Sequence, residues 1–105
     1  MDKETNRVIN SFAKKIKKKF EPSRFVLFGS RARGDNFKSS DYDVLLVSNR
    51  FQGIAFPDRM AKVYGYWDNE CNLEPLCYTE EEFERKRKQQ GIVRTAVKEG
   101  IEVRA

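Results

Sequence analysis

Apolar side chains recur at every fourth position near the start of the chain. Val8, Phe12, Ile16 and Phe20 have this spacing, and lysines fill most of the positions between residues 14 and 19. A repeat close to 3.6 residues places the apolar side chains on one face of a helix. The pattern therefore predicts an amphipathic helix. Pro22 ends it, because the residue before a proline disfavours helical backbone.

Three short apolar runs predict β-strands: 24–28 (RFVLF), 42–47 (YDVLLV) and 72–78 (NLEPLCY). The first two are almost continuously apolar, which is typical of strands that are buried on both faces. Pro75 cannot donate a ladder hydrogen bond, so we expect the third strand to lie at an edge of the sheet.

The remaining segments predict three more helices. Pro57 suits the first turn of one of them. Thr79 and Glu82 have the spacing of a capping box at the start of the next, and the last covers 92–98 and stops at Gly100. The apolar face of the helix at Pro57 is predicted to comprise Met60, Val63, Tyr64 and Trp67.

Helices that alternate with strands predict an α+β or α/β-like domain, with a small sheet and helices packed on it. The 105 residues suit a single domain, 1–105. No apolar run approaches the ~20 residues that span a bilayer, and the first residues lack an apolar signal segment. We therefore expect a cytoplasmic protein with no membrane association, in which Cys71 and Cys77 are free thiols.

The sequence contains no histidine. This excludes Ser-His-Asp and Cys-His catalysis and any metal held by histidine. A metal would have to be bound by oxygen atoms, which favours a hard cation such as Mg²⁺. The net charge of +5 is compatible with a nucleotide, a nucleic acid or an acidic protein as partner, and charge alone does not choose between them.

Residues 28–47 (FGSRARGDNFKSSDYDVLLV) combine features of a catalytic site. Asp41 and Asp43 are two residues apart, so in a strand they lie on one face with Cα atoms about 6.6 Å apart. Their carboxylates repel each other unless a cation lies between them. The pair therefore indicates a site for a divalent cation.

A phosphate site is predicted directly before this pair. Gly29 lets a ligand approach the backbone closely, and Ser30 offers a hydroxyl group and an exposed N–H at the start of a helical turn. Arg31 and Arg33 are expected to add positive charge nearby. A nucleoside triphosphate with Mg²⁺ fits both halves of the motif.

FGSRARG followed by SDYDVLLV resembles the signature of the minimal nucleotidyltransferases, a family of the DNA polymerase β-like nucleotidyltransferase superfamily. CYTEEEFE and AVKEGIEV extend the resemblance along the chain. It implies the nucleotidyltransferase fold, a small mixed sheet flanked by helices. It also implies that Gly29, Ser30 and Arg33 bind the triphosphate, while Asp41 and Asp43 ligate two Mg²⁺ ions.

The family's third carboxylate is usually an aspartate on the next strand. The matching position here holds Glu74, and Asp68 and Glu70 are weaker alternatives. We therefore expect Glu74 to complete the catalytic and metal-binding set, although the departure from aspartate leaves open how active the site is.

Two functions remain open at this stage. The resemblance implies an enzyme that transfers AMP from ATP to a hydroxyl group of a partner, a small helical HEPN-type protein for which this chain would be the antitoxin. The alternative is a catalytically weak or silent module that neutralises its partner by binding. The lysine-rich first helix keeps direct nucleic-acid binding as a weaker third possibility. Base preference, acceptor group and homo-oligomerisation are not determined.

Overall fold

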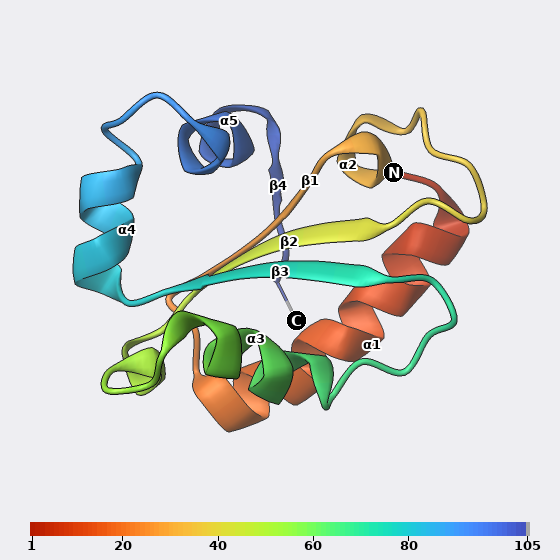
Figure 1. Ribbon diagram of the computed structural model, residues 1–105. Coiled ribbons are helices and arrows are strands. Elements are labelled where there is room, and N and C mark those ends of the chain that lie inside the picture. The colour runs from red at the N-terminus through yellow and green to blue at the C-terminus, as the bar shows by residue number, and fades with distance from the viewer. Residues whose placement is uncertain (105) are drawn as a thin grey trace.

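The computed structural model describes residues 1–104, whose strands form one four-stranded sheet in the order β3-β2-β1-β4 (Figure 1). β1 (Arg24–Phe28) pairs antiparallel with β2 (Tyr42–Val47) and with β4 (Ile101–Glu102). β2 pairs parallel with β3 (Leu73–Tyr78). The sheet is therefore mixed, and β3 with Pro75 lies at its edge, as the sequence predicts.

One face of the sheet is covered by α1 (Lys3–Phe20), α3 (Phe56–Tyr64) and the short 3-10 helix η1 (Asn49–Phe51). The apolar stripe of α1 supplies much of this core, and Ile9 and Ile16 are completely buried. Because side chains alternate along a strand, Val44 and Leu46 of β2 face the same core.

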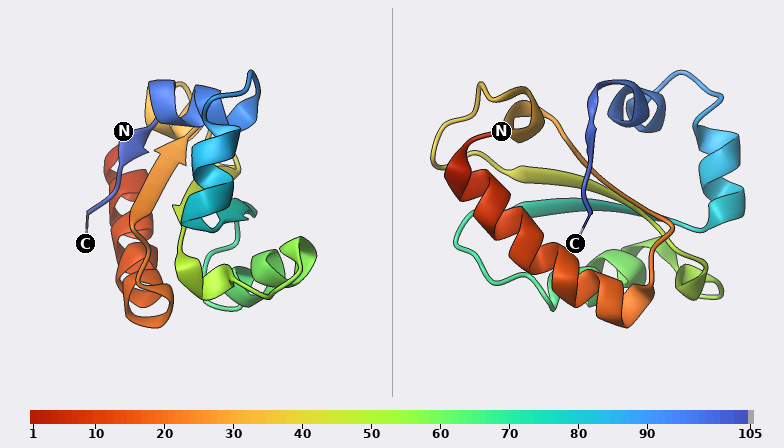
Figure 2. Two further views of the ribbon diagram at one scale, coloured as in Figure 1. Left: turned by 90° about the vertical axis from the view of Figure 1, so that its left-hand side faces the viewer. Right: turned by 180° about the vertical axis from the view of Figure 1, so that it is seen from behind.

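The opposite face packs against α4 (Glu80–Lys86) and α5 (Ile92–Glu99). Figure 2 (left) shows α1 and α4 on opposite sides of the strands. Leu45 and Val47 of β2 meet Phe83 of α4 and Val93 of α5 in this second core. The remaining helix is α2 (Ser30–Arg33), a single turn between β1 and β2. No helix among the described residues has the length and apolar character that crossing a membrane requires.

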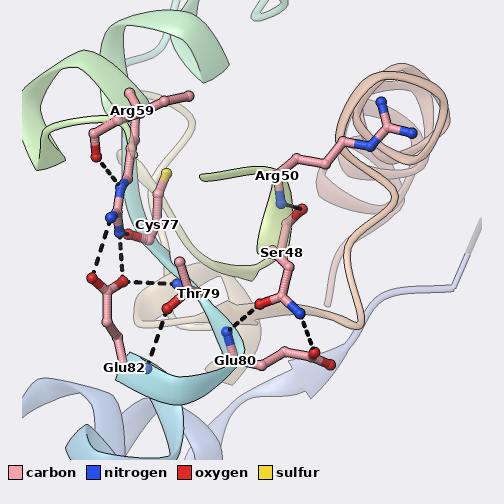
Figure 3. A network of polar contacts seen from close by, with 9 residues as sticks. Ser48, Arg50, Arg59, Cys77, Thr79, Glu80 and Glu82 are labelled. Carbon is pink, nitrogen blue, oxygen red and sulfur yellow. Dashed lines mark hydrogen bonds and ion pairs between the residues drawn. The ribbon is translucent and has the colours of Figure 1, made fainter. Parts of the chain in front are cut away.

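A polar network fixes the ends of β2 and β3 that lie away from α2 (Figure 3). The Thr79–Glu82 capping box forms as predicted. The Glu82 carboxylate also accepts two hydrogen bonds from the buried Arg59 guanidinium, from Nη1 to Oε1 at 2.5 Å and from Nη2 to Oε2 at 3.2 Å. Arg59 Nη1 donates to the carbonyl of Cys77 as well, at 3.2 Å. The network joins α3, β3 and α4 at the end of the sheet that lies away from α2.

Several predicted boundaries need correction. α1 begins at Lys3, before the apolar stripe, because the Asp2 carboxylate accepts a hydrogen bond from Thr5 N at 2.7 Å and caps the helix. α3 ends at Tyr64, which is 44% exposed, and Trp67 lies beyond the helix, against Phe12 and Tyr42. η1 and β4 were not predicted, because segments of three and two residues carry no periodic signal.

Candidate active site at the ends of three strands

The predicted site residues come together where β1 ends and β2 and β3 begin. In the sheet register Asp43 lies between Phe28 on β1 and Glu74 on β3. Figure 1 shows α2 beside this end of the sheet and α4 at the other end. The chain reverses through α2, so β2 pairs antiparallel with β1, and β3 pairs parallel with β2. These two pairings place the end of β1 beside the starts of β2 and β3. The predicted neighbourhood of Asp43 and Glu74 is therefore present.

Asp43 and Glu74 form a close pair of carboxyl groups. Asp43 is partly buried, whereas Glu74 is exposed at the sheet edge. Burial raises the pKa of Asp43 to about 6, and the hydrogen bond with Glu74 and the negative charges of Glu74 and Asp41 contribute to the rise. The Arg33 charge opposes it. Like charges held this close favour a proton or a cation between them.

The backbone at Gly29 is adapted to this pair. Gly29 has φ +77°, a conformation that side-chain-bearing residues rarely adopt. A Cβ atom at this position would also collide with Oδ2 of Asp43. That this glycine admits a ligand stays a prediction, and the structure shows that it makes room for the Asp43 carboxylate.

Ser30 and Arg33 lie on α2, directly after this glycine. The Ser30 carbonyl accepts hydrogen bonds from Gly34 N at 2.8 Å and Asp35 N at 3.2 Å, so the turn is closed on itself. The first N–H groups of a helical turn have no acceptor inside it. The Arg33 side chain is exposed and pairs with Asp35 at 3.2 Å. The turn thus places Ser30 directly after the glycine that packs against Asp43, and the Arg33 charge is close enough to oppose the rise in the pKa of Asp43.

The donor set suits a hard divalent cation. Asp41, Asp43 and Glu74 offer only carboxylate oxygens, and Asp43 carries the raised pKa that a cation would reverse. Among residues 1–104, however, no three such side chains already converge as a metal site. The carboxylates fit Mg²⁺ by their chemistry, and Asp41 or Glu74 would have to turn toward the ion.

The two alternative carboxylates lie elsewhere. Asp68 and Glu70 both belong to the exposed loop between α3 and β3. Asp68 lines a hollow together with Arg7 and Lys15 of α1, on the side of the sheet that α1 covers. Asp43 and Glu74 lie on the other face. Each is two residues before a leucine of the second core, Leu45 on β2 and Leu76 on β3. Glu74 is therefore the carboxylate that the register brings to Asp43.

Arg31 does not lie where the sequence placed it. We expected its charge beside the phosphates, but its side chain is turned inward and is 2% exposed. Its guanidinium contacts Thr5 of α1 and the carbonyls of Lys38 and Ser40. Sequence reasoning missed this role because an arginine next to Gly-Ser reads as a phosphate ligand. The only available signal in the sequence was Thr5, a polar residue on the same face of α1 as the apolar stripe, where a buried hydroxyl group needs a hydrogen-bond partner.

Comparisons with known proteins concern the family and the fold of the chain. The family model described as "Nucleotidyltransferase domain" matches residues 9–103. The fold resembles the crystal structure of a "putative nucleotidyltransferase" from Sulfolobus solfataricus, with 24% identity over 94% of this chain and 78% of that chain and a TM-score of 0.66.

Two structures from Arabidopsis thaliana share part of the fold. The BolA domain of SufE1 has a TM-score of 0.57 and 18% identity over 72% of this chain and 94% of that chain. BolA1 has a TM-score of 0.58 and 21% identity over 78% of this chain and 98% of that chain. At these identities the likeness concerns the fold alone. A search of curated proteins found no significant match.

Proposed function

Because the chain belongs to the nucleotidyltransferase domain family, we propose that it transfers AMP from ATP to a hydroxyl group of a partner protein. The observation that carries the proposal is the meeting of the Gly29–Ser30 turn with Asp43 and Glu74 at one end of the sheet. The turn suits a triphosphate, and the carboxylates suit the cation that accompanies it.

The residues divide the reaction between them. Ser30 and Arg33 bind and orient the triphosphate so that the acceptor oxygen attacks the α-phosphorus in line with the departing pyrophosphate. The bond between the acceptor oxygen and phosphorus forms as the bond to pyrophosphate breaks. Glu74 accepts the hydroxyl proton, which general-base catalysis requires. When bound by Asp41, Asp43 and Glu74, Mg²⁺ would neutralise charge on the phosphates.

The acceptor comes from another molecule in this proposal. The described residues form one sheet with its covering helices, and the helices leave Glu74 exposed. An exposed carboxylate at a sheet edge is accessible to a side chain of a second protein. The sequence resemblance points to a small helical HEPN-type protein as that partner, with this chain as its antitoxin.

The alternative is a module that inactivates its partner by binding alone. It is favoured by Glu74, because the longer glutamate side chain stands where the related enzymes usually have aspartate. An extra methylene group allows the carboxylate more orientations, so the placement that transfer needs is held less firmly.

Transfer is tested by incubating the chain with ATP labelled at the α-phosphate, Mg²⁺ and a candidate helical partner. We expect label on the partner, and none with the Asp43→Asn variant. Lys62→Gln, which changes an exposed residue of α3, serves as the control and should label the partner fully. Tight partner binding without any transfer, by the native chain and by Glu74→Asp alike, would favour the silent module.

A further inference from the structure

The guanidinium of Arg31 is the most extensively bonded buried group next to the site. Nη1 donates to Thr5 Oγ1 at 2.9 Å, and Nε and Nη2 donate to the Ser40 carbonyl at 3.1 and 2.9 Å. Nη2 also donates to the Lys38 carbonyl at 2.9 Å. The Cζ atom lies 4.0 Å from the ring centroid of Tyr42. All three nitrogen atoms of the guanidinium therefore donate hydrogen bonds, and its face packs on an aromatic ring.

Among residues 1–104, no carboxylate lies within ion-pair distance of this buried charge. The ion pairs in the part of the chain that the structure describes use other arginines. The contrast with Arg59 is direct, since Arg59 is similarly buried but meets Glu82. An unpaired cation in the interior is costly unless carbonyl dipoles and an aromatic face replace its hydration. An apolar side chain would fill the same space without that cost.

The contacts of Arg31 join the three segments that carry the candidate site. Arg31 itself follows Ser30 on α2, and the carbonyls it holds belong to the loop that leads directly into Asp41. Nη2 also lies 3.6 Å from Sγ of Cys71, three residues before Glu74, and the same sulfur contacts the Lys38 carbonyl at 3.3 Å. Tyr42 lies between the two aspartates.

We propose that Arg31 is a positioning residue that holds the Asp41–Asp43 segment against the phosphate-binding turn. It touches neither substrate nor cation, and it acts through the backbone of residues 38–42. The inference rests on the proposed function for the identity of the ligands, but the hydrogen bonds that carry it belong to the chain alone. Arg31 thereby determines where the Asp41 and Asp43 carboxylates stand when the cation arrives.

The expected effect is on cation binding more than on nucleotide binding. Loss of a group that orients metal ligands typically weakens metal affinity about 10–100-fold. We expect Arg31→Met to bind Mn²⁺ weaker by about that factor, with kcat lowered and KM for ATP changed little. The Mn²⁺ affinity of Arg31→Lys should lie between those of the native chain and Arg31→Met, because a lysine keeps the charge but can hold fewer of the carbonyls at once.

The experiment compares Arg31→Met and Arg31→Lys with Arg59→Met, the matched change at the other end of the sheet. Mn²⁺ affinity is measured by titration, and hydrogen exchange is measured at the backbone amides of residues 38–42. The proposal expects faster exchange there and weaker Mn²⁺ binding in both Arg31 variants, while Arg59→Met loses stability but keeps the native Mn²⁺ affinity.

Each remaining outcome decides the question. Should Arg31→Met fail to fold, Arg31→Lys and Thr5→Val, which removes one acceptor of the guanidinium, carry the test. Native exchange at residues 38–42 together with native Mn²⁺ affinity in folded Arg31 variants overturns the proposal. A native chain that binds no Mn²⁺ overturns the proposed function instead, and the exchange rates at residues 38–42 then decide on the role of Arg31 by themselves.

Discussion

Gly29 is restricted to glycine for two independent reasons. Its φ of +77° is strained for any residue with a Cβ atom, and the Asp43 carboxylate occupies the space where that atom would lie. At Gly53 only the first reason applies, because it has φ +76° but its Cβ position has no neighbouring atom within 4 Å. The chain thus contains its own control for backbone strain.

Gly29→Ala should lower both stability and transfer, whereas Gly53→Ala should lower stability alone. Strain at a positive φ costs roughly 1–3 kcal/mol, and both variants bear it. Only Gly29→Ala also displaces Asp43. Chemical denaturation and the labelling assay measure the two effects. Equal transfer by both variants would show that the contact between Gly29 and Asp43 is unimportant for the reaction.

Glu74→Gln should preserve ATP binding and reduce transfer. Glutamine is neutral and cannot accept the hydroxyl proton, and general-base roles contribute about 10²–10⁴-fold to rate. Calorimetric titration with ATP and the labelling assay separate binding from transfer. Glu70→Gln, a change in the loop before β3, is the control and should behave as the native chain. Native transfer rates in Glu74→Gln would show that this carboxylate is not the third catalytic group.

At the scale of elements, the start of α4 depends on more than its capping box. The carboxylate of Glu82 accepts hydrogen bonds from Thr79 N at 2.8 Å and from Arg59 of α3. The hydrogen bond from Arg59 lowers the pKa of Glu82 to about 2. Its side chain is 30% exposed, so the charge is only partly screened. The sequence indicated the cap, but Arg59 is remote in the chain and gave no signal of the pairing.

The stability of the chain should therefore fall at acidic pH, because protonation of Glu82 weakens its interaction with Arg59. A carboxyl group whose pKa is lower in the folded chain stabilises fully above its unfolded value of 4.5, and the contribution disappears as the pH falls toward 2. Glu82→Gln should be less stable than the native chain at pH 7 by about 2 kcal/mol, and the two should converge near pH 2. Urea denaturation across this range measures the difference, and Glu81→Gln, an exposed neighbour, should show no such convergence.

At the scale of the molecule, the sheet explains how far the sequence could predict the site. The strands at 24–28 and 42–47 were predicted with their observed bounds, because continuous apolar runs between turn residues leave few alternatives. The register that brings Glu74 to Asp43 could only be suggested, since nothing in either strand fixes their pairing before the fold is known. Arg31 was misplaced because most of its hydrogen bonds go to backbone carbonyls, which no residue type reveals.

A bound cation should stabilise the molecule as a whole, because it offsets the burial and the neighbouring negative charges that raise the pKa of Asp43. Mg²⁺ with ATP at a hundredfold excess over Kd would contribute about 2.7 kcal/mol, which corresponds to a melting temperature higher by roughly 10 °C or more for a domain of this size. Thermal melting with and without the ligands tests this. Asp43→Asn should show no such rise, and an unchanged native melting temperature would contradict cation binding at this end of the sheet.

The pairing of β4 with β1 has a consequence for how the chain folds. Arg24 and Glu102 form an ion pair although they are 78 positions apart, and Val103 N donates to the Phe25 carbonyl at 2.8 Å. All segments of the site are synthesised before residues 101–103 leave the ribosome. Until then the outer edge of β1 has no partner, and an uncovered edge invites pairing with another chain. Closing so long a loop is also entropically slow, so the nascent protein passes through a stage that is exposed to aggregation.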